Sequence, residues 1–177
     1  SVTQSVASAR ALADAMGLSM PKNGELCTNL VLASENITDL ITHFYLFFMP
    51  DFARDTYAGA SWFGDIQGRF KATAGSAATQ MLPARADFLH LMGLMAGKWP
   101  HTLSLQPGGV AKAIEPKERM RLLAIVAGFK RFLESTLFGD SLTTISQLKS
   151  EAELWQWYQQ KPWHSPDFRR FLHVAEV

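Results

Sequence analysis

Apolar residues recur at helical spacing along almost the whole chain, and no other feature limits the fold as strongly. This periodicity predicts a mainly α structure of long antiparallel helices with little or no sheet. The first predicted helix begins at about Val2 and ends before Gly17. The second is expected at about 24–49. Its apolar face is expected to contain Leu26, Leu30, Ile37, Leu40, Ile41, Phe44 and Phe48.

The middle of the chain alternates between weak and strong helical patterns. Residues 51–82 are rich in Gly, Ala and Ser, which predicts an irregular insertion with little core of its own. A third helix is expected at 83–96. Its predicted core residues are Phe88, Leu91, Met92 and Met95. The stretch that follows contains two prolines and three glycines, so we expect a loop there.

The last third of the chain predicts further helices. A long one begins near Pro116, since proline suits a first helical turn, and Gly139 ends it. Residues 150–153 have the form of a capping box, and Ser-Pro-Asp at 165–167 opens another helix. Without repeats or low-complexity tracts, residues 1–177 are expected to form one single α-helical domain.

Composition excludes several classes of partner. The net charge of +1 creates no field that would recruit nucleic acid or an anionic membrane. No apolar run approaches the roughly 20 residues of a membrane span. The single cysteine, Cys27, suits a reducing, cytoplasmic location and excludes a multi-thiolate metal site within this sequence. Because the sequence starts with Ser1 in a pattern that is already helical, we expect a segment cut from a longer chain.

One helical stripe carries unusual polar residues. At 100° per residue the second helix aligns Asn29, Leu32, Asn36, Asp39 and His43, with Glu35 beside them. Two interpretations stay open at this point: a solvated helix face, or an internal polar site in which a buried carboxylate needs a cationic partner. A di-metal carboxylate bundle would need Glu-x-x-His pairs, and the sequence has none.

Four short motifs carry a resemblance to a known family. They are HFY at 43–45, PDF at 50–52, GKWPH at 97–101 and QPGGV at 106–110. Together with the segments 1–52 and 91–115, they resemble the large subunit of nickel–iron hydrogenases. The resemblance implies an internal fragment between that family's two Cys-x-x-Cys motifs, within the helical core. The four thiolates hold a nickel–iron centre with carbonyl and cyanide ligands, which this chain would not retain.

The resemblance also assigns expectations to single residues. Asp39 matches an outer-sphere aspartate above the metals, near an arginine outside this sequence, with Glu35, Asn36 and His43 beside it. Gln4 lies where most of the family has histidine, and Phe47 lies on the gas channel. His101 is expected to face the small subunit.

These assignments favour the regulatory, hydrogen-sensing subgroup, because that subgroup resembles the chain in having Gln4 and Phe47. The implied reaction is the cleavage of dihydrogen to protons and electrons. The implied partners are a small subunit with iron–sulfur clusters and a histidine kinase. A respiratory uptake hydrogenase and a helical binding module without a metal site are the alternatives. The chain alone is expected to be inactive and to self-associate through bared apolar surface.

Overall fold

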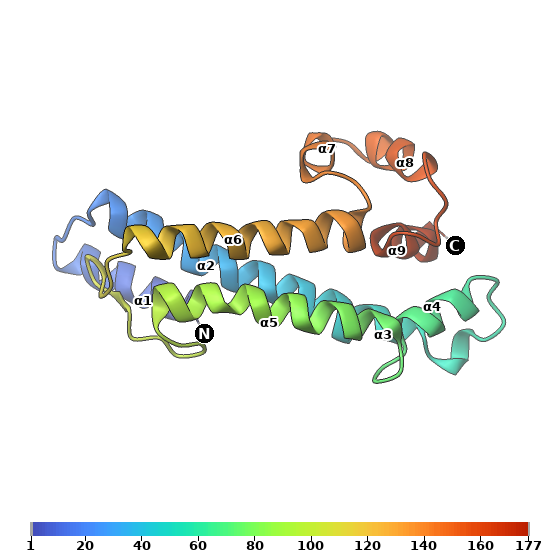
Figure 1. Ribbon diagram of the computed structural model, residues 1–177, viewed down its shortest axis with the longest axis horizontal. Coiled ribbons are helices and arrows are strands. Elements are labelled where there is room, and N and C mark those ends of the chain that lie inside the picture. The colour runs from blue at the N-terminus through green and yellow to red at the C-terminus, as the bar shows by residue number, and fades with distance from the viewer. Residues whose placement is uncertain (1, 177) are drawn as a thin grey trace. The chain divides into compact units, whose positions relative to one another are not determined.

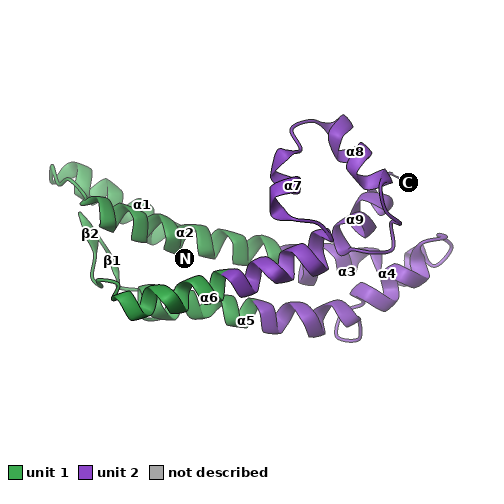
Figure 2. Cartoon of the chain, turned by 45° about the horizontal axis from the view of Figure 1, so that its top comes forward, with its two compact units in different colours: residues 1–42, 85–126 green, residues 43–84, 127–177 purple. Residues whose placement is uncertain are grey.

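The computed structural model describes residues 2–176 and is 71% helical, with two short strands in one small sheet. The predicted mainly α fold is therefore confirmed. The chain divides into two compact units, which Figure 2 colours separately: residues 1–42 with 85–126, and residues 43–84 with 127–177. Because each unit is described by itself, the expected single domain over 1–177 stays a prediction.

Figure 1 labels most of the elements. Unit 1 contains α1 (Val2–Ala15), α2 (Lys22–Thr42), β1 (Leu105–Gln106), β2 (Gly109–Val110), the second part of α5 (Ser76–Ala96) and the first part of α6 (Pro116–Phe132). Unit 2 contains η1 (His43–Phe48), α3 (Met49–Phe52), η2 (Asp55–Tyr57), α4 (Phe63–Phe70), η3 (Leu133–Phe138), α7 (Leu142–Gln147), α8 (Glu151–Gln159) and α9 (Asp167–Glu176), with the remaining parts of α5 and α6. The elements η1 and η3 are π-helices, and η2 is a 3₁₀ turn.

The buried face of α2 is not the one that its leucines predicted. Leu26 is 53% exposed and Leu40 is 68% exposed. The residues that are buried instead are mostly small or polar: Gly24, Thr28, Val31, Ser34, Glu35, Thr38 and Ile41. Small side chains allow close helix packing, and Ser34 satisfies its hydroxyl by donating to the carbonyl of Leu30 at 2.7 Å. The predicted apolar face is therefore wrong for Leu26, Leu30, Ile37 and Leu40, which are exposed, and confirmed for Ile41, which is buried.

The rest of unit 1 follows the sequence more closely. In α1, Val2, Val6, Ala9 and Ala13 are buried, and Gly17 adopts φ +65° just beyond the helix. All four core residues expected in α5 are buried. The loop after α5 contains the antiparallel pair β1–β2. A Cβ at Gly24 would lie 3.3 Å from the Cα of Gly109, so α2 passes β2 at a distance that suits glycine.

Unit 2 corrects the expectation for residues 51–82. This segment forms α3, η2, α4 and the start of α5 rather than an irregular insertion. It also has a core of its own, because six of its hydrophobic residues are buried: Ala53, Trp62, Ile66, Phe70, Ala77 and Met81. Gly and Ala suggested an irregular segment, but the aromatic and aliphatic residues spaced one turn apart in α4 decide the structure.

The C-terminal predictions for unit 2 are confirmed. Gly139 follows η3 with φ +63°. Ser150 and Glu153 form the expected capping box at the start of α8, and α9 begins at Asp167. Arg169 is fully buried, and its Nη1 donates to the carbonyls of Trp157 and Tyr158 in the last turn of α8. This guanidinium therefore supplies donors for carbonyls that lack partners at a helix end.

Asp167 is the centre of a buried ion network in unit 2. Its carboxylate accepts two hydrogen bonds from Arg69, at 2.7 and 2.6 Å, and one from Arg170 at 3.2 Å. The hydroxyl of Tyr45 donates to the same carboxylate at 2.7 Å. Burial, together with the negative charge of Asp167, raises the pKa of Tyr45. The phenol therefore stays protonated and acts as a donor, which ties η1, α4 and α9 together.

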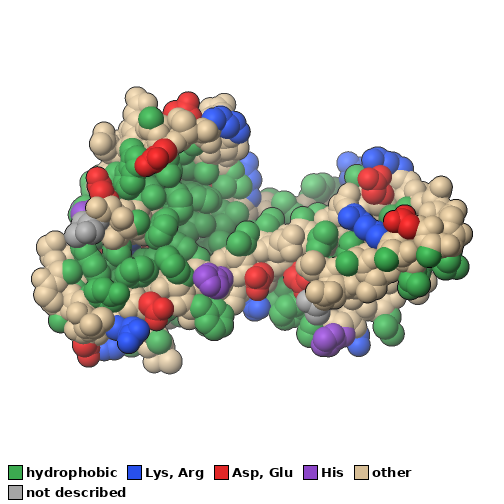
Figure 3. All heavy atoms as spheres, turned by 180° about the vertical axis from the view of Figure 1, so that it is seen from behind, with side chains coloured by type: hydrophobic (Ala, Val, Ile, Leu, Met, Phe, Trp, Pro, Cys, Tyr) green, Lys and Arg blue, Asp and Glu red, His purple; other side chains and the backbone are tan. Residues whose placement is uncertain are grey.

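Both units expose hydrophobic side chains. In the view of Figure 3, hydrophobic side chains, coloured green, gather on the visible face of unit 2. In η1, Phe47 is 65% exposed, and in α6, Met120 is 69% exposed. Among residues 2–176, no helix combines the length and apolar character that crossing a membrane requires.

Candidate functional site

A polar pocket of about 290 Å³ lies along the second half of α2, within unit 1. Glu35, Asp39 and Thr42 line it from successive turns of the helix, with Asn36 and Thr38 between them. The other walls come from Thr3 of α1, Arg85 of α5 and Trp99 in the loop after α5. Three of the residues singled out in the sequence, Glu35, Asn36 and Asp39, therefore meet in one pocket.

Glu35 connects three segments that are distant in the sequence. Its carboxylate accepts hydrogen bonds at 3.0 Å from the backbone amides of both Val2 and Thr3, in the first turn of α1. The indole of Trp99 donates to the same carboxylate at 3.1 Å. Burial by itself would raise the pKa of Glu35, but these hydrogen bonds outweigh it and hold the pKa below its usual value. An ionised carboxylate at a helix N-terminus is favourable.

Arg85 and Trp99 are pocket residues that the sequence reasoning missed. The Nε of Arg85 donates to the Thr42 hydroxyl at 2.7 Å, and its guanidinium lies 5.7 Å from the centre of the Trp99 ring. The Thr42 hydroxyl in turn donates a hydrogen bond to the carbonyl of Thr38 at 2.7 Å, so it both accepts and donates. The GKWPH motif was a signal for Trp99, whereas Arg85 lies in a helix without a distinctive motif.

Asp39 has a different environment from Glu35. Its side chain is exposed to the pocket, and it forms no ion pair with any residue of the described part of the chain. Thr38 is 2% exposed, and its hydroxyl has no hydrogen-bond partner among residues 2–176. The pocket thus contains the hydrogen-bonded carboxylate of Glu35 and the accessible carboxylate of Asp39. It also contains the Arg85 guanidinium, held by Thr42, and the Thr38 hydroxyl, which has no partner among residues 2–176.

The other predicted site residues lie outside this pocket. Gln4 is exposed on α1, and His101 is exposed with φ +61° in the loop after α5. His43 and Phe47 belong to η1 of unit 2, where the His43 ring lies 6.3 Å from that of Phe47 and 6.2 Å from that of Phe48. The structure therefore brings together only part of the polar stripe.

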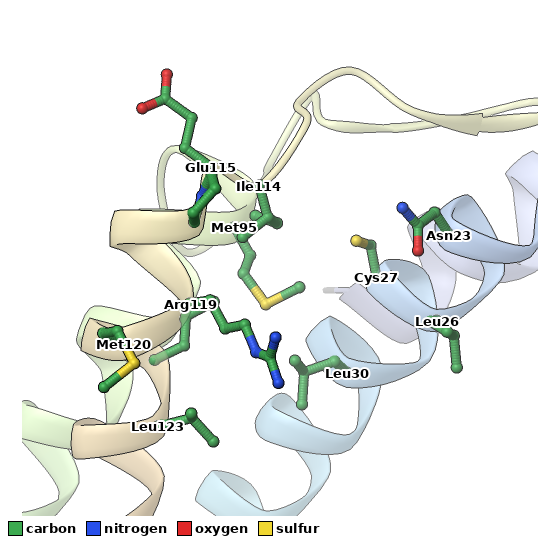
Figure 4. A pocket seen from close by; sticks show the side chains of 12 residues that line it. Asn23, Leu26, Cys27, Leu30, Met95, Ile114, Glu115, Arg119, Met120 and Leu123 are labelled. Atoms are coloured by element: carbon green, nitrogen blue, oxygen red, sulfur yellow. The ribbon is translucent and has the colours of Figure 1, made fainter.

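A second cavity of unit 1, about 880 Å³ in volume, is mainly apolar. Figure 4 shows Cys27 and Leu30 of α2 on one side of it, Met120 and Leu123 of α6 on the other, and Met95 between them. The guanidinium of Arg119 extends towards Leu30, while the Glu115 carboxylate points away. This cavity offers hydrophobic contact and one cation, without the paired polar groups of the smaller pocket.

Residues 2–176 by themselves offer no set of metal ligands. Within residues 2–176, no group of three or more His, Cys, Asp or Glu side chains could hold a metal ion. The single cysteine, Cys27, is half-buried at the apolar cavity. A metal that requires several thiolates therefore does not fit the residues present here.

The match to a known family lies at the N-terminal end. Residues 1–60 match the family model for nickel-dependent hydrogenases. This segment contains α1, α2 and η1, and hence most of the polar pocket's lining residues. The match supports a relation to the nickel-dependent hydrogenases over this segment. No curated protein matches the chain.

Proposed function

We propose that the chain is a segment of a nickel–iron hydrogenase large subunit, and that it belongs to the regulatory, hydrogen-sensing subgroup. The observation that carries the proposal is the match over residues 1–60, which includes the α2 residues of the polar pocket. The parent protein would oxidise or sense dihydrogen. Thiolates that are absent from this sequence would hold its metals, because the residues present do not fit them.

In this proposal the pocket supplies the protein's wall near the metals. Asp39 is the outer-sphere carboxylate, since it is accessible from the pocket. Glu35 is a positioning residue, because its carboxylate accepts hydrogen bonds from the amides of Val2 and Thr3 and from the indole of Trp99. These bonds hold the start of α1 in place. Asn36 adds polar groups to the same wall. His43 belongs to the neighbouring π-helix turn, and its contribution to the polar stripe is part of the proposal.

The assignment to the sensing subgroup rests on two residues. Gln4 would stand beside a metal-binding thiolate, and the Phe47 ring would narrow the gas path to the metals. A respiratory uptake hydrogenase is the second candidate, and a helical binding module without a metal site is the third. The sensing role would add a histidine kinase to the small-subunit partner, which we place near His101. Because a single cysteine suits a reducing compartment, we propose a cytoplasmic location, or the cytoplasmic face of the membrane through partners.

Metal analysis tests the proposed relation. The large subunit that contains this segment, produced together with its small subunit, should contain stoichiometric nickel and reduce a redox dye with hydrogen. Asp39→Asn should lower the rate about tenfold or more while the nickel content is unchanged, because the loss concerns electrostatics rather than ligation. Asp87→Asn, an exposed change on α5, is the matched control. The absence of nickel from the assembled protein would contradict the proposal.

Oxygen sensitivity separates the sensing subgroup from the uptake subgroup. Phe47→Leu should speed the loss of hydrogen-dependent dye reduction under oxygen, because a smaller side chain widens the gas path. Leu46→Ala, a change in the same turn of η1, controls for altered packing. An unchanged rate of oxygen inactivation in Phe47→Leu would remove the main support for the sensing subgroup.

The isolated chain provides a further test. We expect neither stoichiometric nickel nor hydrogen-dependent dye reduction from these 177 residues alone, because they hold one cysteine and no described metal-ligand cluster. Activity in the isolated chain would show that the metals are held in some other way.

A further inference from the structure

The apolar cavity of unit 1 has hydrophobic side chains on three sides. Leu30 of α2 lies on one side, Met120 and Leu123 of α6 lie on the other, and Met95 of α5 lies between them (Figure 4). The volume of about 880 Å³ falls within the usual range of small-molecule sites. Leu30 is 39% exposed and Met120 is 69% exposed, so no element of residues 2–176 covers these walls. The cavity is therefore open to a ligand from solution.

Two charged residues line this cavity, and one of them is unpaired. The Arg119 guanidinium extends towards Leu30 and has no hydrogen-bond or ion-pair partner among residues 2–176. Glu115 does not neutralise it, because the Glu115 carboxylate points away from the cavity and pairs with the ammonium of Lys117 at 2.9 Å. The cavity thus combines apolar walls with one positive charge that lacks a counter-charge.

These features select the class of ligand. A purely hydrophobic molecule would leave the guanidinium without a counter-charge, and a small polar anion would leave the apolar walls uncovered. A hydrocarbon chain that ends in a carboxylate satisfies both, since a carboxylate matches the forked N–H groups of a guanidinium. The flexible thioethers of Met95 and Met120 suit a flexible chain, because methionine adapts to irregular apolar shapes.

We propose that the apolar cavity binds a free fatty acid of medium chain length. Its carboxylate pairs with Arg119, and its hydrocarbon chain lies between α2 and α6. The affinity then depends on two separable contributions, the length of the chain and the charge of the head group. The inference goes beyond the proposed hydrogenase role and requires neither a metal nor the polar pocket.

Cys27 provides a reporter inside the cavity. It is the single cysteine of the sequence, it is half-buried, and it lines the cavity, so a thiol reagent modifies one defined place. Alkylation by N-ethylmaleimide is followed by mass spectrometry, at a protein concentration where sedimentation shows one species. Decanoate, kept below its micelle concentration, should slow the alkylation saturably because the bound chain covers the thiol. The same titration of the urea-unfolded chain should show no protection.

Two ligand series separate the hydrocarbon chain from the head group. From octanoate to dodecanoate, each added methylene should lower the concentration for half-protection about threefold to fourfold. 1-Decanol has the same chain length as decanoate without the charge, and decylammonium carries the opposite charge. Decanoate should reach half-protection at about a threefold lower concentration than 1-decanol, and decylammonium should require the highest concentration of the three.

Variants assign the two ends of the ligand. Arg119→Gln should weaken decanoate about threefold and leave 1-decanol unchanged, since only the carboxylate uses the guanidinium. Arg121→Gln, an exposed change on the same helix outside the cavity, is its matched control. Leu30→Gln should weaken both ligands about threefold or more, because it removes apolar contact. Leu40→Gln, on the same helix and outside the cavity, should weaken neither.

Four outcomes would overturn the inference: no saturable protection, an affinity that does not rise with chain length, equal protection by decylammonium, or unchanged decanoate affinity in Arg119→Gln. Protection that follows protein concentration and not decanoate would assign the cavity to a second copy of the chain, which also overturns it. Circular dichroism shows whether each variant is folded, and Arg119→Ala serves if Arg119→Gln is not. Because the titration uses no metal and no hydrogen, its failure would leave the hydrogenase proposal intact.

Discussion

At the scale of single residues, Glu35 joins three segments of unit 1 through its hydrogen bonds. Glu35→Gln removes the negative charge that two backbone amides and the Trp99 indole share, and it places an amide donor against other donors. We expect the free energy of unfolding to fall by about 1–3 kcal/mol at neutral pH. Urea unfolding measures the difference. Glu25→Gln, on an exposed ion pair with Lys22, should change it by less than about 0.5 kcal/mol.

The same residue predicts a pH dependence. The pKa of Glu35 is below its ordinary value of 4.5, so the folded state binds its proton less readily than the unfolded state. The stabilisation is therefore fully present above the ordinary pKa and is lost as the pH falls through the lower, folded pKa. The stability gap between the unaltered chain and Glu35→Gln should narrow in that acidic range. A constant gap from neutral pH down to below the folded pKa would show that ionisation of Glu35 is not responsible.

Asp167 is the corresponding residue of unit 2. Asp167→Asn removes the buried carboxylate to which both Arg69 and Arg170 donate hydrogen bonds. We expect a loss of about 3–5 kcal/mol in the free energy of unfolding, the usual result of breaking a buried ion pair. Thermal and urea unfolding both measure it. Asp51→Asn, whose contact with Arg54 is 4.0 Å long and exposed, is the control and should be nearly neutral.

At the scale of elements, α2 allows a direct test of which face is buried. Leu40→Gln changes a side chain that is 68% exposed, so stability should stay within about 0.5 kcal/mol. Val31→Ala shortens a side chain that is 2% exposed and should cost about 1–3 kcal/mol. Unfolding curves that ranked the two changes in the opposite order would favour the face that the leucines suggested.

The sequence predicted the elements better than it predicted their faces. Helix periodicity, the capping box at Ser150 and the stop at Gly139 are local signals, and all three are confirmed. The face of α2 depends on what packs against it. Of its buried Ser and Thr residues, Ser34 donates to a carbonyl within the helix, whereas the Thr38 hydroxyl has no partner among residues 2–176. The apolar pattern of one helix does not show which neighbouring elements cover its faces.

The π-helix η1 sets another limit on prediction. A stripe drawn at 100° per residue assumes an unbroken α-helix, whereas η1 begins at His43 and its hydrogen bonds span five residues. The 100° spacing that aligns Asn36 with Asp39 therefore does not predict on which side of the helix His43 lies. For the candidate site, Glu35, Asn36 and Asp39 were predicted together. The GKWPH motif pointed to Trp99 without placing it in the pocket, and no motif pointed to Arg85.

At the scale of the whole molecule, exposed apolar surface predicts self-association. Leu26 and Leu30 of α2 and Met120 and Leu123 of α6 are exposed and line the apolar cavity. Exposed apolar surface of this kind usually marks a contact surface. We expect the sedimentation coefficient to rise with protein concentration. The double change Met120→Gln with Leu123→Gln should reduce this rise, while Arg121→Gln on the same helix should not. A single monomeric species at every concentration would contradict the prediction.

The hydrogen bonds of Glu35 also have a consequence for synthesis on the ribosome. Val2 and Thr3 are made before their carboxylate partner, which follows 33 and 32 residues later, and Trp99 comes 64 residues after Glu35. Unit 1 needs residues 85–126, and unit 2 needs residues 127–177. Neither unit can therefore complete its fold before these later residues are made, and translation takes seconds at that length. Helices α1 and α2 therefore keep their packing surfaces uncovered until residues 85–126 are made.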